Sequence, residues 1–387
     1  MANEERVSAL VLGGGVGGLV AARRLRNLLP AEHRVVMVER EPRHVFAPSL
    51  LWVMTGDRSL SSISRSLARL ERKGIEVVRG DVEEIDPVRR CVRFDGRTIA
   101  ADFLVVALGA DFAPELVPGL EAGGATFCTS AGAEAVRAAL ERFRGGRLVI
   151  LTAAPAYKCP AAPYEAAMLL DHWLRRRGLR ERTEIALHAA EPGPMVVAGP
   201  EVSAAVRAMV EERGVAYHPA HQIVEVDATT QRLRFSNGDE AGYDLLIHVP
   251  PVRSPAVARS AGLTAESGWI AVDRHSLATR FERVFAVGDV TGIPLKLGKP
   301  LPKAGVFAHA QAEVVARNIA RVVTGRGDPA AFDGHGECFV ETGNGRAGFG
   351  RGNFYAEPLP SVTLRPPARR WHAGKVLLEK SWLWRWF

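Results

Sequence analysis

Long hydrophobic runs are missing from this 387-residue sequence, and its opening residues do not have the pattern of a secretory leader, unless processing has removed one. No apolar run reaches the roughly 18–20 residues that are needed to span a bilayer. The opening residues, MANEERVSALVLGGG, pass from a polar segment into a strand without the basic, apolar and small-residue regions of a signal peptide. Hydrophobic residues make up 47% of the chain and charged residues 24%, which excludes a disordered protein. We therefore expect a folded protein of two domains, or three, on the cytoplasmic side of the cell membrane.

Cysteine pairs of the CxxC type are also absent, although the chain has four cysteines. Without such a pair a zinc site is not expected, and we predict no bound metal. In a cytosolic chain the ordinary interpretation of a cysteine is a buried, inert thiol. That interpretation suits Cys91, which lies in the alternating, strand-like segment RRCVRF. The segments around Cys128, Cys159 and Cys338 favour a different interpretation.

A glycine-rich turn near the N-terminus joins an apolar strand to a helix. The strand is expected at residues 7–13, and a second strand, RVVMVE, at residues 34–39. Only glycine lets the backbone turn so sharply and approach a pyrophosphate closely, and the helix N-terminus then offers free N–H groups. Glu39, at the end of the second strand, is placed to bind ribose hydroxyls. The pattern GxGxxG, which predicts dinucleotide binding here, is formed by Gly13, Gly15 and Gly18.

Two later segments, each a strand followed by a turn, indicate which dinucleotide is bound. DFLVVALGA contains Gly109, and RVFAVGDVTG contains Gly288 and Asp289. Both resemble motifs of FAD-dependent oxidoreductases of the pyridine-nucleotide-disulfide type. The resemblance implies that the cofactor is FAD and that Asp289 contacts the flavin ribityl chain. The alternative is that both segments are ordinary buried strands that end in turns.

This resemblance also implies an α/β fold with two Rossmann-like domains, as in glutathione reductase. The FAD-binding domain would be discontinuous and would comprise residues 1–112 and 245–330. A second Rossmann-like domain would occupy residues 113–244. Residues 331–387 would form a small C-terminal region that contacts the membrane.

The second domain lacks the glycines that a nicotinamide cofactor requires. The strand-like RLVILTA leads into APAYKCPAAPYE, and no glycine occurs between Gly146 and Gly178. Side chains and prolines occupy the place of a pyrophosphate, so we predict that nicotinamide binding is lost. The turn instead carries Cys159 at the expected start of a helix, where the helix dipole and Lys158 would favour its thiolate. Glu165 either relays protons or favours the helix N-terminus as an acidic first-turn residue.

The cysteine segments resemble those of one group of flavoenzymes. KCPAAPYE, with Cys159, and GECFVETGNG, with Cys338, are similar to segments of sulfide:quinone oxidoreductases and of the flavin subunit of flavocytochrome c sulfide dehydrogenases. LPKAGVFAHAQAEVVARNIA resembles their flavin-contacting helix, which implies that Lys303 lies near the isoalloxazine ring. TFCTSAGAEAVRAAL places Cys128 before a helix, as in three-cysteine sulfide:quinone oxidoreductases. A small buried residue is the alternative for Cys128.

The resemblance implies sulfide chemistry. Hydrosulfide would be oxidised to sulfur or polysulfide through a disulfide or persulfide of Cys159 and Cys338, with Cys128 and Glu165 assisting. Electrons would pass through FAD to a membrane quinone, ubiquinone or menaquinone. Candidates for the quinone site are Phe339, Phe354 and Tyr355.

The C-terminal segment is basic and aromatic. Residues 361–387 hold six lysines and arginines against Glu379 alone, which is most of the net charge of +7. Tryptophan prefers the membrane–water interface and cations attract anionic lipid, so we expect a membrane-contacting tail and no nucleic-acid partner. The alternative is that the tail packs against its own protein or against a subunit. The sequence does not decide whether the protein is a homo-oligomer. The four tryptophans of the last 17 residues are Trp371, Trp382, Trp384 and Trp386.

Three other functions compete with this one. The flavin subunit of a flavocytochrome c sulfide dehydrogenase would be exported and would lack the aromatic tail. An NADH:quinone oxidoreductase would need the second glycine pattern and no pair of redox cysteines. A flavin-bound sulfur sensor or scaffold without turnover would keep FAD binding alone.

Overall fold

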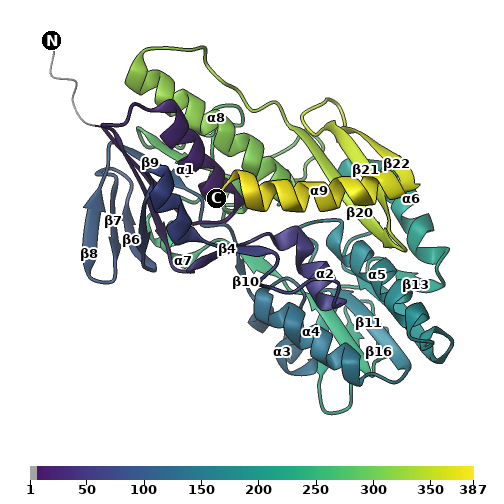
Figure 1. The fold of residues 1–387 in the computed structure, drawn as a ribbon. Coiled ribbons are helices and arrows are strands. Elements are labelled where there is room, and N and C mark those ends of the chain that lie inside the picture. The colour runs from purple at the N-terminus through teal and green to yellow at the C-terminus, as the bar shows by residue number, and fades with distance from the viewer. Residues whose placement is uncertain (1–6) are drawn as a thin grey trace, which may run out of the picture.

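The computed structural model describes residues 7–387 and confirms the α/β class (Figure 1). A five-stranded parallel sheet has the order β19, β9, β1, β2 and β5. Alternate side chains of its strands point to opposite faces, so both faces of this apolar sheet are covered. Helices α1 and α8 cover one face, and the small antiparallel sheet β6–β8 covers the other with α7. The bounds are β1 (Ser8–Leu12), α1 (Val16–Leu28), β2 (Arg34–Glu39), β5 (Glu76–Arg79), β6 (Val82–Asp86), β7 (Cys91–Phe94), β8 (Arg97–Ala100), β9 (Phe103–Val106), α7 (Ala256–Ser260), β19 (Val284–Ala286) and α8 (Gly305–Thr324).

A second parallel sheet, of four strands, is built from the middle of the chain in the order β13, β12, β11 and β17. Helices α4, α5 and α6 bury their apolar sides against one face of this sheet. The antiparallel meander β14–β16 packs on the other face. The bounds are α4 (Ser130–Arg142), β11 (Gly146–Thr152), α5 (Ala162–Arg176), β12 (Thr183–Ala189), α6 (Pro200–Glu211), β13 (Val215–His218), β14 (Ile223–Asp227), β15 (Arg232–Phe235), β16 (Glu240–Gly242) and β17 (Leu245–Val249).

Shorter elements connect the two parallel sheets. A pair of strands, β3 and β4, follows β2, and the strands β10 and β18 pair where the chain passes between the sheets. Helix α2 packs its apolar residues against the core of the second sheet. The bounds are β3 (Arg43–Val45), α2 (Leu50–Met54), β4 (Ser64–Ser66), β10 (Asp111–Phe112), α3 (Leu120–Gly123) and β18 (Val252–Arg253).

The C-terminal region is an antiparallel sheet followed by a helix. Strands β20 (His335–Gly343), β21 (Arg346–Asn353) and β22 (Ser361–Ala368) pair in chain order, and α9 (Arg369–Arg385) follows. Figure 1 shows α9 running from this sheet back to α1, so that the C-terminus lies beside the N-terminal sheet. Among residues 7–387, no helix combines the length and the apolar character needed to cross a bilayer.

Much of α9 is packed against the protein, as in the alternative considered for this tail, and only one edge of the helix is exposed. Trp382 and Trp386 are buried in the core of the first sheet, because the helix lies across α1 and α8. The Trp382 indole N–H donates to His44 Nε2 at 3.0 Å, and His44 Nδ1 contacts the Gly14 carbonyl at 2.9 Å. Trp384 is the outward-facing exception, with 83% of its surface exposed.

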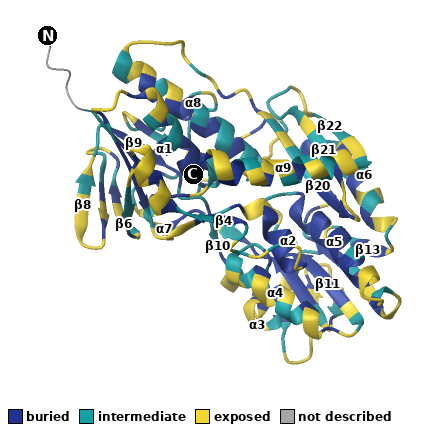
Figure 2. Cartoon of the chain, in the orientation of Figure 1, coloured by how far each residue is buried: buried dark blue, intermediate teal, exposed yellow. Residues whose placement is uncertain are grey.

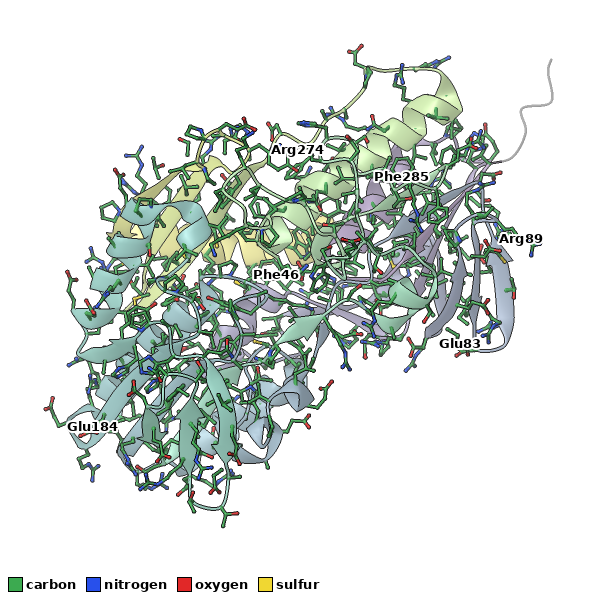
Figure 3. The ribbon with its side chains drawn as sticks, turned by 180° about the vertical axis from the view of Figure 1, so that it is seen from behind. Phe46, Glu83, Arg89, Glu184, Arg274 and Phe285 are labelled. Carbon is green, nitrogen blue, oxygen red and sulfur yellow. The ribbon has the colours of Figure 1, made fainter. Side chains whose placement is uncertain are left out.

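Burial follows this layering. The inner strands of both parallel sheets are buried, whereas the edge strand β5 and the outer sides of the surface helices carry exposed and half-buried residues (Figure 2). Seen from behind, Glu83 of β6, Arg89 of the turn after β6 and Glu184 at the start of β12 project into solvent, while Phe46 lies inside the molecule (Figure 3). The two cores meet where the loop before α8 contacts the loop before α5, and the predicted site residues converge there.

Candidate functional site

The turn between β1 and α1 has the geometry of a pyrophosphate cradle. Gly13 has φ +99°, and a Cβ there would lie 2.5 Å from the Ala107 carbonyl oxygen. A Cβ on Gly18 would lie 1.8 Å from the Gly13 oxygen, so glycine is required where helix and turn pack. At Gly15 no other atom lies within 4 Å of an added Cβ, so a ligand has room to approach the backbone. Helix α1 starts without a side-chain cap and without an acid in its first turn, which leaves its N-terminus suited to an anion.

Glu39 closes the other side of this turn. Its carboxylate accepts hydrogen bonds from the Gly14 N–H and, at 2.8 Å, from the Glu41 N–H. The carboxylate therefore lies at the tip of β2 beside the glycines, where an acid of a dinucleotide site is expected. These residues fit the ADP part of FAD.

A second group of predicted cofactor residues gathers around Lys303. The Lys303 ammonium donates to the Asp289 carbonyl at 2.6 Å and to the Thr291 carbonyl at 3.2 Å, and it lies 3.2 Å from the centre of the Trp269 ring. Burial lowers the pKa of Lys303 to about 8, although Asp289 opposes the shift. The Gly288 N–H donates to Gln311 Oε1 at 2.7 Å, which fixes the turn that carries Asp289.

The turn with Cys159 is joined directly to this group. The Cys159 N–H donates to the Lys303 carbonyl at 2.8 Å. The Lys158 ammonium lies 3.9 Å from the Asp289 carboxylate, and a Cβ on Gly109 would lie 4.0 Å from the same ammonium. The loop after β11 thus lies against both later glycine turns, as the sequence analysis requires of a cysteine that works beside a flavin.

The structure brings three of the four cysteines together. The Glu341 N–H donates to Glu165 at 2.8 Å and so joins β20, the strand of Cys338, to α5, the helix that follows Cys159. Cys338 and Cys128 both raise the pKa of Cys159, although 179 residues separate Cys159 from Cys338. All four cysteines are free thiols of intermediate exposure. Cys91 lies apart from the other three, at the start of β7 in the small sheet beside the first core.

The expected low pKa of Cys159 is wrong for the free thiol. Helix α5 begins only at Ala162, so Cys159 precedes it and adopts φ +57° outside the helix. Removal from water raises the pKa of the Cys159 thiol well above its usual value, and Cys338 and Glu165 raise it further. Burial also raises the pKa of Cys338 to about 12 and that of Cys128 to about 11. The cation that opposes these shifts at Cys159 and Cys338 is Lys375.

Glu165 is the acceptor of a buried ion pair that the sequence analysis missed. Its Oε1 accepts from the Lys375 ammonium at 2.8 Å and from the Glu341 N–H at 2.8 Å. Burial alone would lower the pKa of Lys375, but Glu165 and Glu341 raise it above its usual value. His372 contacts the Glu341 carboxylate at 2.9 Å. Lys375 lies 210 residues from Glu165, on the helix that was expected to face lipid, so no local pattern pointed to the pair.

Side chains fill the turn where a nicotinamide cofactor would bind in the second sheet. Tyr157 and Tyr164 both donate to Glu191 Oε1, the latter at 3.0 Å, and Thr152 donates to Glu191 Oε2 at 3.2 Å. All four residues are buried. Burial raises the pKa of Glu191 despite these hydrogen bonds. This closed cluster supports the prediction that nicotinamide binding is lost.

The three quinone candidates do not form one cluster. Phe339 contacts Phe349, whose ring stacks on Trp371 of α9 at 4.6 Å between ring centres. Phe354 and Tyr355 lie beyond the end of β21, in contact with Phe307 and Phe332 respectively. Tyr355 also donates to the Arg274 carbonyl at 2.8 Å.

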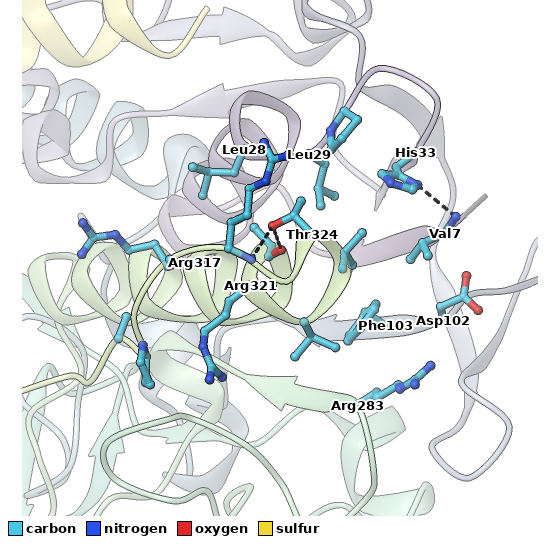
Figure 4. A pocket seen from close by; sticks show the side chains of 18 of the residues that line it. Val7, Leu28, Leu29, His33, Asp102, Phe103, Arg283, Arg317, Arg321 and Thr324 are labelled. Carbon is cyan, nitrogen blue, oxygen red and sulfur yellow. Dashed lines mark hydrogen bonds between the residues drawn. The ribbon is translucent and has the colours of Figure 1, made fainter. Parts of the chain in front are cut away.

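A cavity of about 1250 Å³ lies away from all these residues, at the C-terminal end of α8 (Figure 4). Its wall includes His33, Arg283, Arg317 and Arg321 and none of the residues predicted for the site. The cavity therefore has no part in the redox site.

Known proteins are similar to this chain in fold and in sequence. A family model described as pyridine nucleotide-disulphide oxidoreductase matches residues 7–312. The mitochondrial sulfide:quinone oxidoreductase of Mus musculus is 27% identical over 90% of this chain and 79% of its own length. The sulfide-quinone reductase of Aquifex aeolicus is 29% identical over 97% and 90%. The X-ray structure of the sulfide:quinone oxidoreductase from Aquifex aeolicus matches with a TM-score of 0.90 at 26% identity, covering 98% of this chain and 91% of that chain.

Proposed function

Because the chain belongs to the pyridine nucleotide-disulphide oxidoreductase family, we propose that it is a sulfide:quinone oxidoreductase. It oxidises hydrosulfide to sulfur or polysulfide and passes the electrons to a quinone. The observation that carries this proposal is the meeting of Cys159, Cys338 and the Lys303 loop, which come from three distant parts of the chain. A packed core has no need of three polar cysteines beside a buried lysine, whereas sulfur transfer next to a cofactor does.

FAD is the cofactor, and when bound it supplies a two-electron acceptor. The glycine turn before α1 holds its pyrophosphate, and Glu39 holds the adenosine ribose. Asp289 and Lys303 hold the flavin end, with Gly109 and Gly288 allowing the backbone to approach it. Lys303 carries a positive charge that favours an anion beside it.

The sulfur step is an exchange between Cys159 and Cys338. In the oxidised protein these two cysteines share a sulfur–sulfur bond. Hydrosulfide forms a new bond to the Cys338 sulfur, the bond to Cys159 breaks, and Cys159 leaves as a thiolate that holds the electron pair. The proton of hydrosulfide stays on the persulfide, and Cys128 accepts or releases longer sulfur chains.

Lys375 stabilises the Cys159 thiolate that this exchange produces. Its charge lowers the pKa of Cys159 and of Cys338, against the opposite effects of burial and of Glu165. Glu165 holds the Lys375 ammonium in place at 2.8 Å. Glu165 is therefore a positioning residue in this proposal, which differs from both roles considered from the sequence.

The quinone ring binds at Phe339, on the side of β20 that faces α9. Phe339, Phe349 and Trp371 offer adjoining aromatic rings there, and all three are only partly buried. Phe354 and Tyr355 are proposed as supporting residues at the far end of the same strands.

The protein reaches its quinone as a peripheral membrane protein on the cytoplasmic side. The exposed edge of α9 is the proposed contact, because Leu377 and Trp384 lie two turns apart on one face with 69% and 83% of their surface exposed. Arg385 and Lys380 add positive charge for anionic lipid.

We expect the double variant Leu377→Glu, Trp384→Glu to lose binding to vesicles that contain phosphatidylglycerol. Each buried apolar side chain contributes about 1.5–3 kcal/mol, so binding should weaken by about 100-fold or more. Cosedimentation measures it, and Leu116→Glu is the matched control, because Leu116 is 59% exposed outside α9. Unchanged binding of the double variant would reject the α9 contact.

The function itself is tested by anaerobic titration of the purified flavoprotein. Hydrosulfide should bleach the visible flavin absorption, decylubiquinone should restore it, and NADH should leave it unchanged, because the Tyr157–Glu191 cluster fills the nicotinamide turn. Bleaching by NADH and not by hydrosulfide would reject the proposal in favour of an NADH:quinone oxidoreductase.

A further inference from the structure

Three histidines come together on the second parallel sheet, away from the cysteines. His188 of β12 and His218 of β13 are register partners on neighbouring parallel strands, so their rings lie on the same face of the sheet. His221 follows in the loop after β13. The three residues offer ring nitrogens that all lie within 4.8 Å of one another.

The hydrogen bonds of this cluster leave ring nitrogens available. His188 is 5% exposed, and its buried Nδ1 has no hydrogen-bond partner among residues 7–387. His221 Nδ1 contacts the Pro219 carbonyl at 2.9 Å, which assigns the proton to Nδ1 and leaves a lone pair on Nε2. That lone pair faces the Asp239 carboxylate at 3.1 Å. Two acceptors that face each other at this distance need a cation between them, either a proton or a metal ion.

We propose that His188, His218 and His221 form a binding site for a divalent transition-metal ion, with Zn²⁺ as the best fit, and that Asp239 supports it from the solvent edge through its contact with His221. Imidazole and carboxylate are ligands of Zn²⁺, which takes four of them in a tetrahedron. With metal–ligand bonds of about 2.0–2.1 Å, neighbouring ligand atoms lie about 3.3 Å apart. The 3.1 Å between His221 Nε2 and Asp239 Oδ2 is already close to that value. The His188 and His218 rings are stacked at 4.4 Å between centres, so the rings of His218 and His221 must turn about their Cβ–Cγ bonds to bring their nitrogens to this spacing around an ion held by His188.

The surroundings hold the ring of His188 in place. Phe235 stacks on His188 at 4.8 Å between ring centres and fixes the plane of that ring.

An entry path exists for the ion. A cavity of about 610 Å³ adjoins the cluster and is lined by all three histidines and Asp239. Ala186 and Ala216, which precede His188 and His218 on the same face, keep this cavity open because their side chains are small. Asp239 is 60% exposed and provides the solvent edge of the site.

A bound ion would have a structural effect. It would connect β12 and β13 to the turn between β15 and β16, and so hold the meander on the second sheet. Since no cysteine belongs to the site, the ion is separate from the sulfur chemistry of Cys159 and Cys338.

The test uses full-length, untagged holoprotein stripped of metal by a chelator and titrated with Co²⁺ in place of Zn²⁺. We expect one equivalent of Co²⁺ to produce the strong visible bands of four-coordinate Co²⁺, without the bands of a cobalt–thiolate bond, and Zn²⁺ to displace it. Asp239→Asn, at an exposed position, should weaken binding by about 10- to 100-fold, and His218→Gln by at least as much. His335→Gln is the matched control, because His335 also faces a carboxylate, that of Asp333 at 2.9 Å, but stands alone.

Zn²⁺ should also raise the melting temperature of the wild type and of His335→Gln, and leave that of Asp239→Asn unchanged at the same concentration. The proposal is overturned if Co²⁺ gives only weak six-coordinate bands. It is also overturned if the three variants bind Co²⁺ equally, or if binding disappears in a Cys159→Ser, Cys338→Ser background. None of these measurements depends on sulfide oxidation. The metal site and the proposed function are therefore tested separately.

Discussion

The Cys159→Ser variant should bind FAD and fold like the wild type, yet hydrosulfide should no longer reduce its flavin. Serine nearly matches cysteine in size, but it cannot share a sulfur–sulfur bond with Cys338 or leave as a thiolate. Removal of a covalent nucleophile typically costs several orders of magnitude, so the rate of flavin reduction should fall by about 10³-fold or more. Anaerobic stopped-flow measurement of the flavin absorption, with hydrosulfide in excess, gives this rate directly.

Cys91→Ser is the matched control for this experiment. Cys91 is also a free cysteine of intermediate exposure, but it lies in the small sheet β6–β8 and not among the redox cysteines. Its substitution should leave the rate of flavin reduction within about two-fold of the wild type, as expected for a residue outside the site. If Cys159→Ser were reduced as fast as Cys91→Ser, the sulfur exchange proposed here would be rejected, and Cys159 would be an ordinary packed thiol.

The parts of the fold that the sequence predicted are those set by local pattern. The strands expected at residues 7–13 and 34–39 are β1 and β2, because continuous apolar runs mark strands that are buried on both faces. Gly13 was predicted for a sharp turn and has φ +99° there. Family resemblance implied that Lys303 lies near the flavin and that Cys159 is a redox cysteine, and the hydrogen bond from the Cys159 N–H to the Lys303 carbonyl joins these two segments.

Long-range electrostatics could not be predicted in the same way. The sequence argument gave Cys159 a low pKa from a helix dipole and from Lys158, since only neighbours in the chain were visible. The dominant effects are burial and the charges of Cys338, Glu165 and Lys375, which depend on how distant segments pack. The role of each site residue stays a prediction until the variants are measured.

Amino-acid composition alone does not determine whether the C-terminal helix faces the membrane or packs against the protein. Tryptophans and cations near a chain end are typical of a membrane-contacting segment, but the same residues also suit a helix that packs against its own domain. In α9 the two roles are divided by face: Trp382 and Trp386 point inward and Trp384 outward. The histidine cluster was missed for a related reason, because pairing between β12 and β13 joins His188 to His218 across 30 residues.

The Lys375→Met variant is expected to lose about 3–5 kcal/mol of unfolding free energy, the cost of leaving one partner of a buried ion pair uncompensated. Lys375 and Glu165 have 5% and 3% of their side-chain surface exposed, so solvent cannot replace the missing charge. Chemical denaturation of the holoprotein measures the loss. Lys380→Met is the matched control, because the Lys380 ion pair with Glu379 is on the same helix but 56% of the Lys380 side chain is exposed. It should cost less than about 0.5 kcal/mol.

The double variant Lys375→Met, Glu165→Gln distinguishes charge from packing. Methionine and glutamine keep the approximate shapes and remove both charges, so the double variant should recover most of the stability lost in the single one. If it stayed as unstable as Lys375→Met, lost packing against Trp52 would be the cause instead of the uncompensated carboxylate.

The contribution of Lys375 to the unfolding free energy should decrease at high pH. The folded-state pKa of Lys375 is raised, so its contribution is fully present below the unfolded value of about 10.4 and is lost as the pH rises through the folded value. The stability gap between the wild type and Lys375→Met should therefore be constant near neutral pH and narrow above about pH 10.4. A gap that narrowed already near neutral pH would mean that Lys375 is not held as a cation beside Glu165. Its proposed role in stabilising the Cys159 thiolate would then be lost as well.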